Sequence, residues 1–214
     1  MYQRMFQYVK DLLLSYGDEA GIGDFPFRKR SEHIKRVFKW AERITYEEPD
    51  IDRDAVLTAA IFHDVGYSVP YNGLSHAENG AVICEKYLKE NNFDAKFIDL
   101  VVYLVKNHSR KELMTDRDVP KELILLMEAD LLDETGALSI VWDCMSEGNE
   151  EIQSFEKTYN HLLDYSYQSM ELNPMITPKA RALWEKKKEL VESFISHLKC
   201  DLALDDGELT GIRL

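Results

Sequence analysis

Apolar residues recur along this chain with the spacing of α-helices. Between residues 2 and 16 they fall three or four positions apart, and a second stripe of this kind runs from residue 34 to residue 44. This spacing places side chains on one helical face, whereas a half-buried strand requires alternation with a period of two. No stretch alternates convincingly in that way, so the pattern predicts an all-α fold.

Turn formers and capping residues indicate where the helices begin. Ser31 and Ser75 stand at N-cap positions ahead of apolar stripes, and Pro178 suits the first turn of the last helix. The segment "GYSVPYNGLS" is rich in turn residues and predicts a loop between the third and fourth helices. The expected helices are 2–16, 32–44, 53–64, 76–91, 94–108, 119–134, 139–147, 149–171 and 177–202.

These elements predict a single helical domain over residues 1–205. Its core is expected at about 28–135, with flanking C-terminal helices at about 139–202. The chain has 214 residues and is 45% hydrophobic, which suffices for one sizeable core. The polar segment 206–214 contains two glycines and is expected to fray.

Charge and composition exclude several classes of function. The net charge of −13 argues against binding of a nucleic-acid polymer or an anionic membrane, since both need clustered Lys and Arg. No apolar run is long enough for a membrane span, and the charged N-terminal segment does not have the pattern of a secretory signal. The 3 cysteines form no CxxC pair and suit a reducing compartment, so a cytoplasmic location is expected.

Some polar residues occupy positions that the helical periodicity assigns to the core. His63 continues the stripe of Val56, Ala59 and Ala60, and Asp130 points where leucines of its helix point. Burying a carboxylate without a partner costs several kcal/mol, so such a group is paired, neutralised or bound to metal. No Lys or Arg lies on these apolar faces. Histidine and carboxylate together therefore predict a metal site.

The candidate metal ligands come from five separate helices, each near a helix end or on its inner face. A helical bundle can bring such side chains to one point. The six candidates are His33, His63, Asp64, His76, His108 and Asp130. They are enough for two ions bridged by Asp64, although a single histidine at a helix end is more often a cap or a core residue. His161 and His197 lack a comparable neighbouring carboxylate and are interpreted as structural or surface residues.

Several blocks of the chain resemble the HD-domain metal-dependent phosphohydrolase superfamily, in particular its small bacterial hydrolases. The matching blocks are "HIKRVFKWAERI", "AAIFHDVGY", "LSHAENGA", "VKNHS" and "EADLLDETGAL", and the resemblance covers roughly residues 28–200. It implies an HD-domain-like helical bundle that hydrolyses phosphate esters or anhydrides, commonly in nucleotides. By position, His33, His63, Asp64 and Asp130 match the ligands of a single-metal site. His76 and His108 match the positions that hold a second metal in the bimetal branches.

Two departures from the family pattern leave the substrate open. Tyr67 and Leu131 stand where relatives often carry a basic residue that can contact phosphate. Other residues must then bind the substrate, although an exposed charge is usually only solvated and a loop tyrosine usually only packs. The substrate-binding candidates are Arg36, Lys106, Arg110, Lys111 and Tyr67.

The chemistry expected from the resemblance is attack on phosphorus by a metal-activated hydroxide. Asp64 would bind metal and orient or deprotonate the water, with His76 and His108 as further catalytic residues. Asp133 could fix a histidine tautomer, although an aspartate near a helix end is more often solvated. The expected cofactor is one or two divalent ions, with Fe, Mn, Zn, Ni, Co and Mg not distinguished. The expected partner is a small phosphorylated molecule, in particular a nucleotide, and the oligomeric state stays open. The alternatives are a metal-stabilised binding or regulatory domain without turnover, and oxidative cleavage at a di-iron site.

Overall fold

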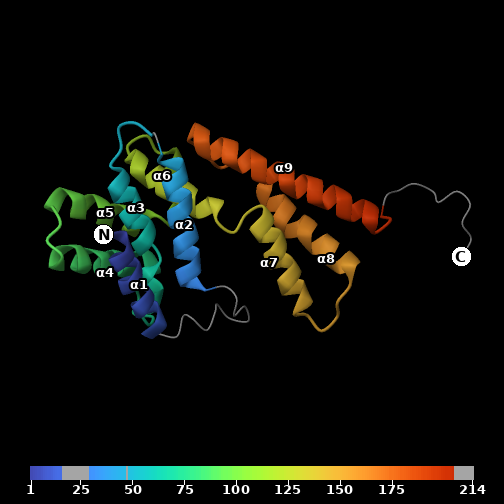
Figure 1. The fold of residues 1–214 in the computed structure, drawn as a ribbon, viewed down its shortest axis with the longest axis horizontal. Coiled ribbons are helices and arrows are strands. Elements are labelled where there is room, and N and C mark those ends of the chain that lie inside the picture. The colour runs from blue at the N-terminus through green and yellow to red at the C-terminus, as the bar shows by residue number, and fades with distance from the viewer. Residues whose placement is uncertain (16–28, 47, 205–214) are drawn as a thin grey trace, which may run out of the picture. The chain divides into compact units, whose positions relative to one another are not determined.

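The computed structural model describes residues 1–15, 29–46 and 48–204. Within these residues the regular elements are all helical, which confirms the predicted all-α fold (Figure 1). The chain divides into two compact units. The first unit comprises Met1–Asp133 and Met175–Arg181, and the second comprises Glu134–Pro174 and the chain from Ala182 onward. The expected domain boundaries remain a prediction.

The first unit is built around a helix that is buried along most of its length. Its main helices are α1 (Tyr2–Ser15), α2 (Arg30–Ile44), α3 (Arg53–Phe62), α4 (His76–Glu90), α5 (Ala95–Asn107) and α6 (Lys121–Leu132). Every residue of α3 from Ala55 to Phe62 is buried, because α1, α2, α5 and α6 all pack against it. Two short 3-10 turns, η2 (Val65–Ser68) and η3 (Lys111–Thr115), follow α3 and α5. The end of α3 therefore lies at the centre of this unit.

Capping residues explain several helix starts. Ser75 and Glu78 form a capping box at the start of α4, which confirms the predicted cap. The predicted cap at Ser31 is wrong. The helix α2 begins at Arg30 with Lys29 at the N-cap position, two residues earlier than predicted, so Ser31 lies buried inside the first turn.

The predicted helix 149–171 is also wrong. Ser154 caps α8 (Phe155–Leu162) by accepting a hydrogen bond from the Lys157 backbone N–H, so the helix begins later. It then widens into a π-turn at Leu163–Tyr167 and tightens into a 3-10 turn at Gln168–Met170. The other helices agree with expectation to within a few residues, including α7 (Ala137–Gly148) and α9 (Pro178–Asp201).

A buried carboxylate anchors the start of α9 to α6. Glu128 is fully buried and accepts hydrogen bonds of 2.6 Å from the backbone N–H groups of Ile176 and Thr177 and from the Thr177 hydroxyl. Burial raises the pKa of Glu128, and the three hydrogen bonds favour its charged form. A negative charge at the N-terminus of a helix is favourable. This contact therefore holds Ile176 and Thr177, the two residues before Pro178, against α6.

Some expectations fall outside the described residues. These are the end of the first helix at residue 16 and the frayed tail 206–214. Among the described helices, none combines the length and the apolar character that crossing a bilayer requires.

Candidate metal centre

The six predicted ligands lie together around the C-terminal end of α3. His33 lies in the first turn of α2, and Asp130 lies near the end of α6. His63 directly follows α3, and Asp64 leads into η2. His76 opens α4 and His108 directly follows α5. His63, Asp64 and His108 are almost completely buried, whereas the side chains of His76 and Asp130 reach the surface.

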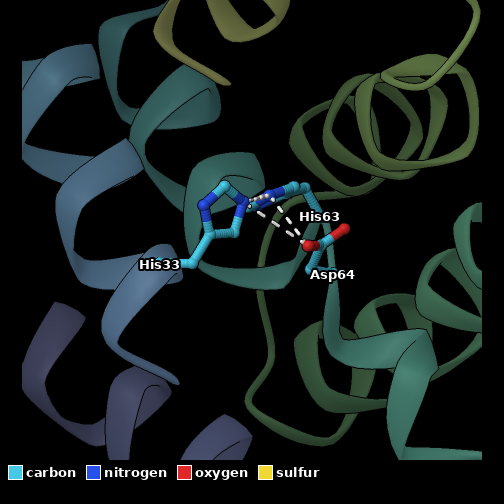
Figure 2. Close-up of side chains that lie close together, drawn as sticks. All are labelled: His33, His63 and Asp64. Atoms are coloured by element: carbon cyan, nitrogen blue, oxygen red, sulfur yellow. Dashed lines mark hydrogen bonds and ion pairs between the residues drawn. The ribbon is translucent and has the colours of Figure 1, made fainter. Parts of the chain in front are cut away.

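Three of these side chains surround one point, and Asp130 lies beside two of them. The Nε2 atoms of His33 and His63 are 3.2 Å apart, and Asp64 Oδ2 lies 3.5 and 3.6 Å from them (Figure 2). Asp130 Oδ1 lies 3.4 and 3.8 Å from the same two nitrogens. Ligands bound at about 2.1 Å to one ion lie about 3.4 Å apart in tetrahedral geometry. The spacing and the donor atoms therefore fit a divalent transition metal.

A second cluster uses the other oxygen of Asp64. Asp64 Oδ1 lies 3.6 Å from His76 Nε2 and 3.5 Å from His108 Nε2, and these two nitrogens are 3.3 Å apart. Each cluster contains three donor atoms close enough to hold an ion. Because the two oxygens of one carboxylate face different pairs of imidazoles, Asp64 is placed to bridge two ions.

The helix ends orient two of the histidine rings. His63 Nδ1 lies 2.9 Å from the Ala60 carbonyl oxygen, and His108 Nδ1 lies 2.7 Å from that of Val105. The last carbonyls of a helix have no partner within the helix, so a ring that directly follows the helix can donate its Nδ1–H to one of them. That hydrogen bond leaves the Nε2 lone pair free to bind metal.

A carboxylate orients the third ring. His33 Nδ1 lies 2.7 Å from Asp133 Oδ2, which is the role predicted for Asp133. Arg36 donates to both oxygens of Asp133, from Nε at 2.9 Å and from Nη2 at 3.0 Å. Arg36 was a candidate for binding substrate phosphate, but the structure places its guanidinium on Asp133, where it supports the orientation of His33.

The other substrate-binding candidates differ in their distance from the site. Lys111 Nζ lies 2.6 Å from Asp130 Oδ2, and the Tyr67 ring stacks on His76 with centroids 4.4 Å apart. Arg110 donates to Glu112 and has a side chain that is 56% exposed. Lys106 is exposed on α5. Lys111 and Tyr67 thus contact the proposed ligands directly.

The sequence analysis missed Arg30 and misread His161. Arg30 Nη1 lies 2.7 Å from Asp64 Oδ2, and its position three residues before His33 on the same helix was the available signal. His161 was expected to have no carboxylate beside it. In the second unit its Nδ1 lies 3.0 Å from Glu147 and its Nε2 lies 3.5 Å from Asp143. Both acids come from α7, four residues apart, so the pairing appears only when α7 and α8 pack.

Most of these groups have the protonation state that metal binding requires. Burial lowers the pKa of His63 to about 4, so the ring is neutral. Burial alone would raise the pKa of Asp64, but His63, His108 and Arg30 hold it well below its usual range. Burial likewise opposes ionisation of Asp130, and His33 and Lys111 overcome it. The carboxylates are therefore charged at neutral pH.

His33 is the exception and makes metal binding pH-dependent. Burial disfavours its charged form, but Asp130 and Asp133 outweigh that effect and raise its pKa to about 9. Below pH 9 an ion must displace one proton from His33. We expect the apparent Mn²⁺ affinity to rise about tenfold per pH unit from pH 6.5 to about 9 and then level off. Calorimetry in two buffers of different ionisation enthalpy measures the released proton, and an affinity independent of pH would contradict the assignment.

The same raised pKa gives the metal-free protein an opposite pH dependence. A histidine whose pKa rises on folding stabilises the folded state fully below its unfolded pKa, near 6.5. That contribution is lost as the pH rises through about 9. The His33 contribution to the free energy of unfolding, measured without metal, should therefore decrease from pH 6.5 to pH 9, whereas metal affinity increases.

The comparisons with known proteins identify the family. Residues 30–135 match the family model of the HD domain. This part of the chain belongs to the HD-domain superfamily, as predicted from the sequence blocks. No curated protein sequence is significantly similar to it.

Solved structures share the fold over nearly the whole chain. A predicted HD superfamily hydrolase from an uncultured Thermotogales bacterium superposes with a TM-score of 0.67 at 20% identity, covering 94% of this chain and 92% of that chain. An HD-superfamily hydrolase from Bacillus thuringiensis gives 0.67 at 21% identity and covers 94% and 96%. YpgQ of Bacillus subtilis in complex with ADP gives 0.63 at 22% identity and covers 93% of both chains. These likenesses establish the fold.

Proposed function

We propose that the protein is a metal-dependent phosphohydrolase that cleaves a phosphoester or phosphoanhydride of a nucleotide or another small phosphorylated molecule. The observation that carries the proposal is the Asp64 carboxylate, whose two oxygens each face a separate pair of imidazole Nε2 atoms. The HD-domain match supports hydrolase chemistry. The ADP found with YpgQ supports a nucleotide as the ligand class.

The bound ions would supply charge neutralisation for the phosphate and would lower the pKa of a water molecule toward neutrality. The chain itself supplies the geometry. Asp64 would hold the ions together and orient the attacking water, since its charged form is strongly favoured. His76 and His108 would complete the second site, and the exposed edge of His76 leaves that site open towards substrate.

Lys111 is the best placed of the original candidates to contact substrate. Its ammonium group lies 2.6 Å from Asp130 Oδ2, and its side chain is 32% exposed. When Asp130 binds an ion, part of its charge is neutralised, and the nearby ammonium is then available to an incoming phosphate. Arg110 and Lys106 lie further out and would act only by attracting an anionic substrate over a distance.

The test is product release from a panel of phosphorylated molecules. Nucleoside mono-, di- and triphosphates and p-nitrophenyl phosphate are incubated with metal-loaded protein, once for each of Mn²⁺, Mg²⁺, Co²⁺, Ni²⁺, Zn²⁺ and anaerobic Fe²⁺. We expect release of phosphate or pyrophosphate that stops when a chelator removes the ions, and the released species identifies the cleaved bond. No release across the panel with ions bound would favour a binding or regulatory domain. Product formation that requires O₂ would indicate oxidative cleavage instead.

A further inference from the structure

The side chain of Arg30 lies beside the bridging carboxylate. Arg30 opens α2 and its Nη1 donates to Asp64 Oδ2 at 2.7 Å. The side chain is only 14% exposed, so its charge is largely removed from water. A buried guanidinium is costly unless its charge is compensated, and Asp64 provides that compensation here. Arg30 thus belongs to the wall of the site.

The Tyr67 ring packs against this guanidinium. The Arg30 Cζ atom lies 4.1 Å from the centroid of the Tyr67 ring, and the His76 ring stacks on Tyr67 at 4.4 Å with an interplanar angle of 12°. Two groups this close to one centroid cannot share a face, so Tyr67 lies between Arg30 and His76. The Tyr67 ring therefore has no open face for a nucleobase. It instead links the arginine to a ligand of the second cluster.

The donors of Arg30 are only partly used. A guanidinium carries five N–H groups, and Asp64 takes one of them. The Arg30 Nε atom is buried and has no hydrogen-bond partner among the described residues. An unpaired buried donor costs free energy, so it indicates that an acceptor binds there in the working protein. The planar fork of arginine matches the oxygens of a phosphate group.

We infer that Arg30 binds the phosphoryl group of the substrate and that Tyr67 positions its guanidinium for this contact. The inference rests on the proposed phosphohydrolase function. It accounts for the departure from the family pattern at Tyr67. Arg30 on α2 provides the positive charge that is absent at position 67, and the Tyr67 ring packs against its guanidinium. Because Asp64 contacts both Arg30 and the two imidazole pairs, a phosphate held by Arg30 lies next to the metal centre.

The test measures binding of inorganic phosphate to the Mn²⁺-loaded protein by calorimetry. In Arg30→Ala we expect the phosphate Kd to rise about ten- to hundredfold, the loss typical of a charged hydrogen-bond partner, with the ion content per chain unchanged. Arg30→Lys should lose less, because it keeps the charge without the fork. Arg30→Gln serves if the alanine variant does not fold, and it should match the alanine result.

Arg43 provides a matched control. It also lies on α2 with its guanidinium over an aromatic ring, 4.6 Å from the centroid of Trp40. Arg43 stands 13 residues from Arg30, about 20 Å along the helix. Arg43→Ala should leave both phosphate affinity and ion content at the wild-type values.

Variants of Tyr67 test its positioning role. Tyr67→Phe keeps the ring and should bind phosphate as the wild type does. Tyr67→Leu removes the ring and should weaken phosphate binding severalfold while both ions stay bound. Equal phosphate affinity in the two variants would overturn the positioning role.

The outcomes separate this inference from the proposed function, because phosphate binding does not require turnover. If Arg30 only positions Asp64, Arg30→Ala lowers the Mn²⁺ affinity and leaves the phosphate Kd at saturating metal unchanged, which would overturn the inference. Absence of phosphate binding by the metal-loaded wild type would overturn it as well. If the nucleotide panel shows no hydrolysis but Arg30→Ala weakens phosphate binding, the assignment of Arg30 stands and the hydrolase proposal fails.

Discussion

Asp64→Asn is expected to remove both ions and to abolish hydrolysis. The asparagine amide keeps the volume of the side chain but carries no charge and has only one oxygen, so it cannot serve two imidazole pairs that lie 3.5 to 3.6 Å from opposite oxygens. We expect turnover to fall by more than about 100-fold, the upper range for residues that merely support a ligand. Elemental analysis of the purified variant reports the ion content directly.

Two comparisons sharpen this prediction. His76→Ala removes a ligand of the second cluster alone and should leave one ion per chain. Asp99→Asn, an exposed change on α5, should retain the wild-type ion content and turnover. Two ions in Asp64→Asn would show that the carboxylate does not bridge, and the two-ion arrangement would have to be abandoned.

Gly66→Ala is expected to destabilise the first unit strongly. A Cβ atom on Gly66 would lie 1.9 Å from the His76 carbonyl oxygen and 2.6 Å from the Gly80 nitrogen. Both are backbone atoms of α4, so no side chain can move aside. Overpacking a core typically costs 1–3 kcal/mol, and a clash with backbone places this variant at about 3 kcal/mol or more. Urea unfolding measures the loss.

The same change should disturb the second ion before the first. The turn η2 and α4 must separate to admit the methyl group, and His76 is the first residue of α4. Gly148→Ala is the matched control, because a Cβ at that helical position meets nothing within 4 Å. It should leave the free energy of unfolding unchanged or raise it by about 0.5–1 kcal/mol. Equal stability of the two variants would contradict the close-packing argument.

The positions of the proposed ligands were predictable because they depend on local periodicity. A histidine or aspartate in an apolar stripe must point into the core, and a bundle brings such stripes together. The prediction for Asp130 followed from its leucine neighbours alone. The cap at Ser75 was equally local, since its partner Glu78 stands only three residues away.

The supporting contacts were not predictable in the same way. The Arg36–Asp133 pair spans 97 positions of sequence and the Arg30–Asp64 pair spans 34. Such pairs depend on how helices pack, and an exposed arginine has the same local pattern as an arginine in a binding site. The later start of the helix predicted at 149–171 depends on a cap at Ser154 in a polar segment with weak periodicity.

The shared carboxylate couples occupancy of the two ion positions. An ion on one oxygen of Asp64 withdraws negative charge from the other oxygen and also repels a second cation. The second ion therefore binds more weakly than it would beside a free carboxylate, and by linkage each ion weakens the other equally. Loading of two ions would then be anticooperative, so the protein would pass from singly to doubly occupied centres over a broad range of free metal. Its rate of hydrolysis would therefore change gradually with the concentration of free metal, without a sharp threshold.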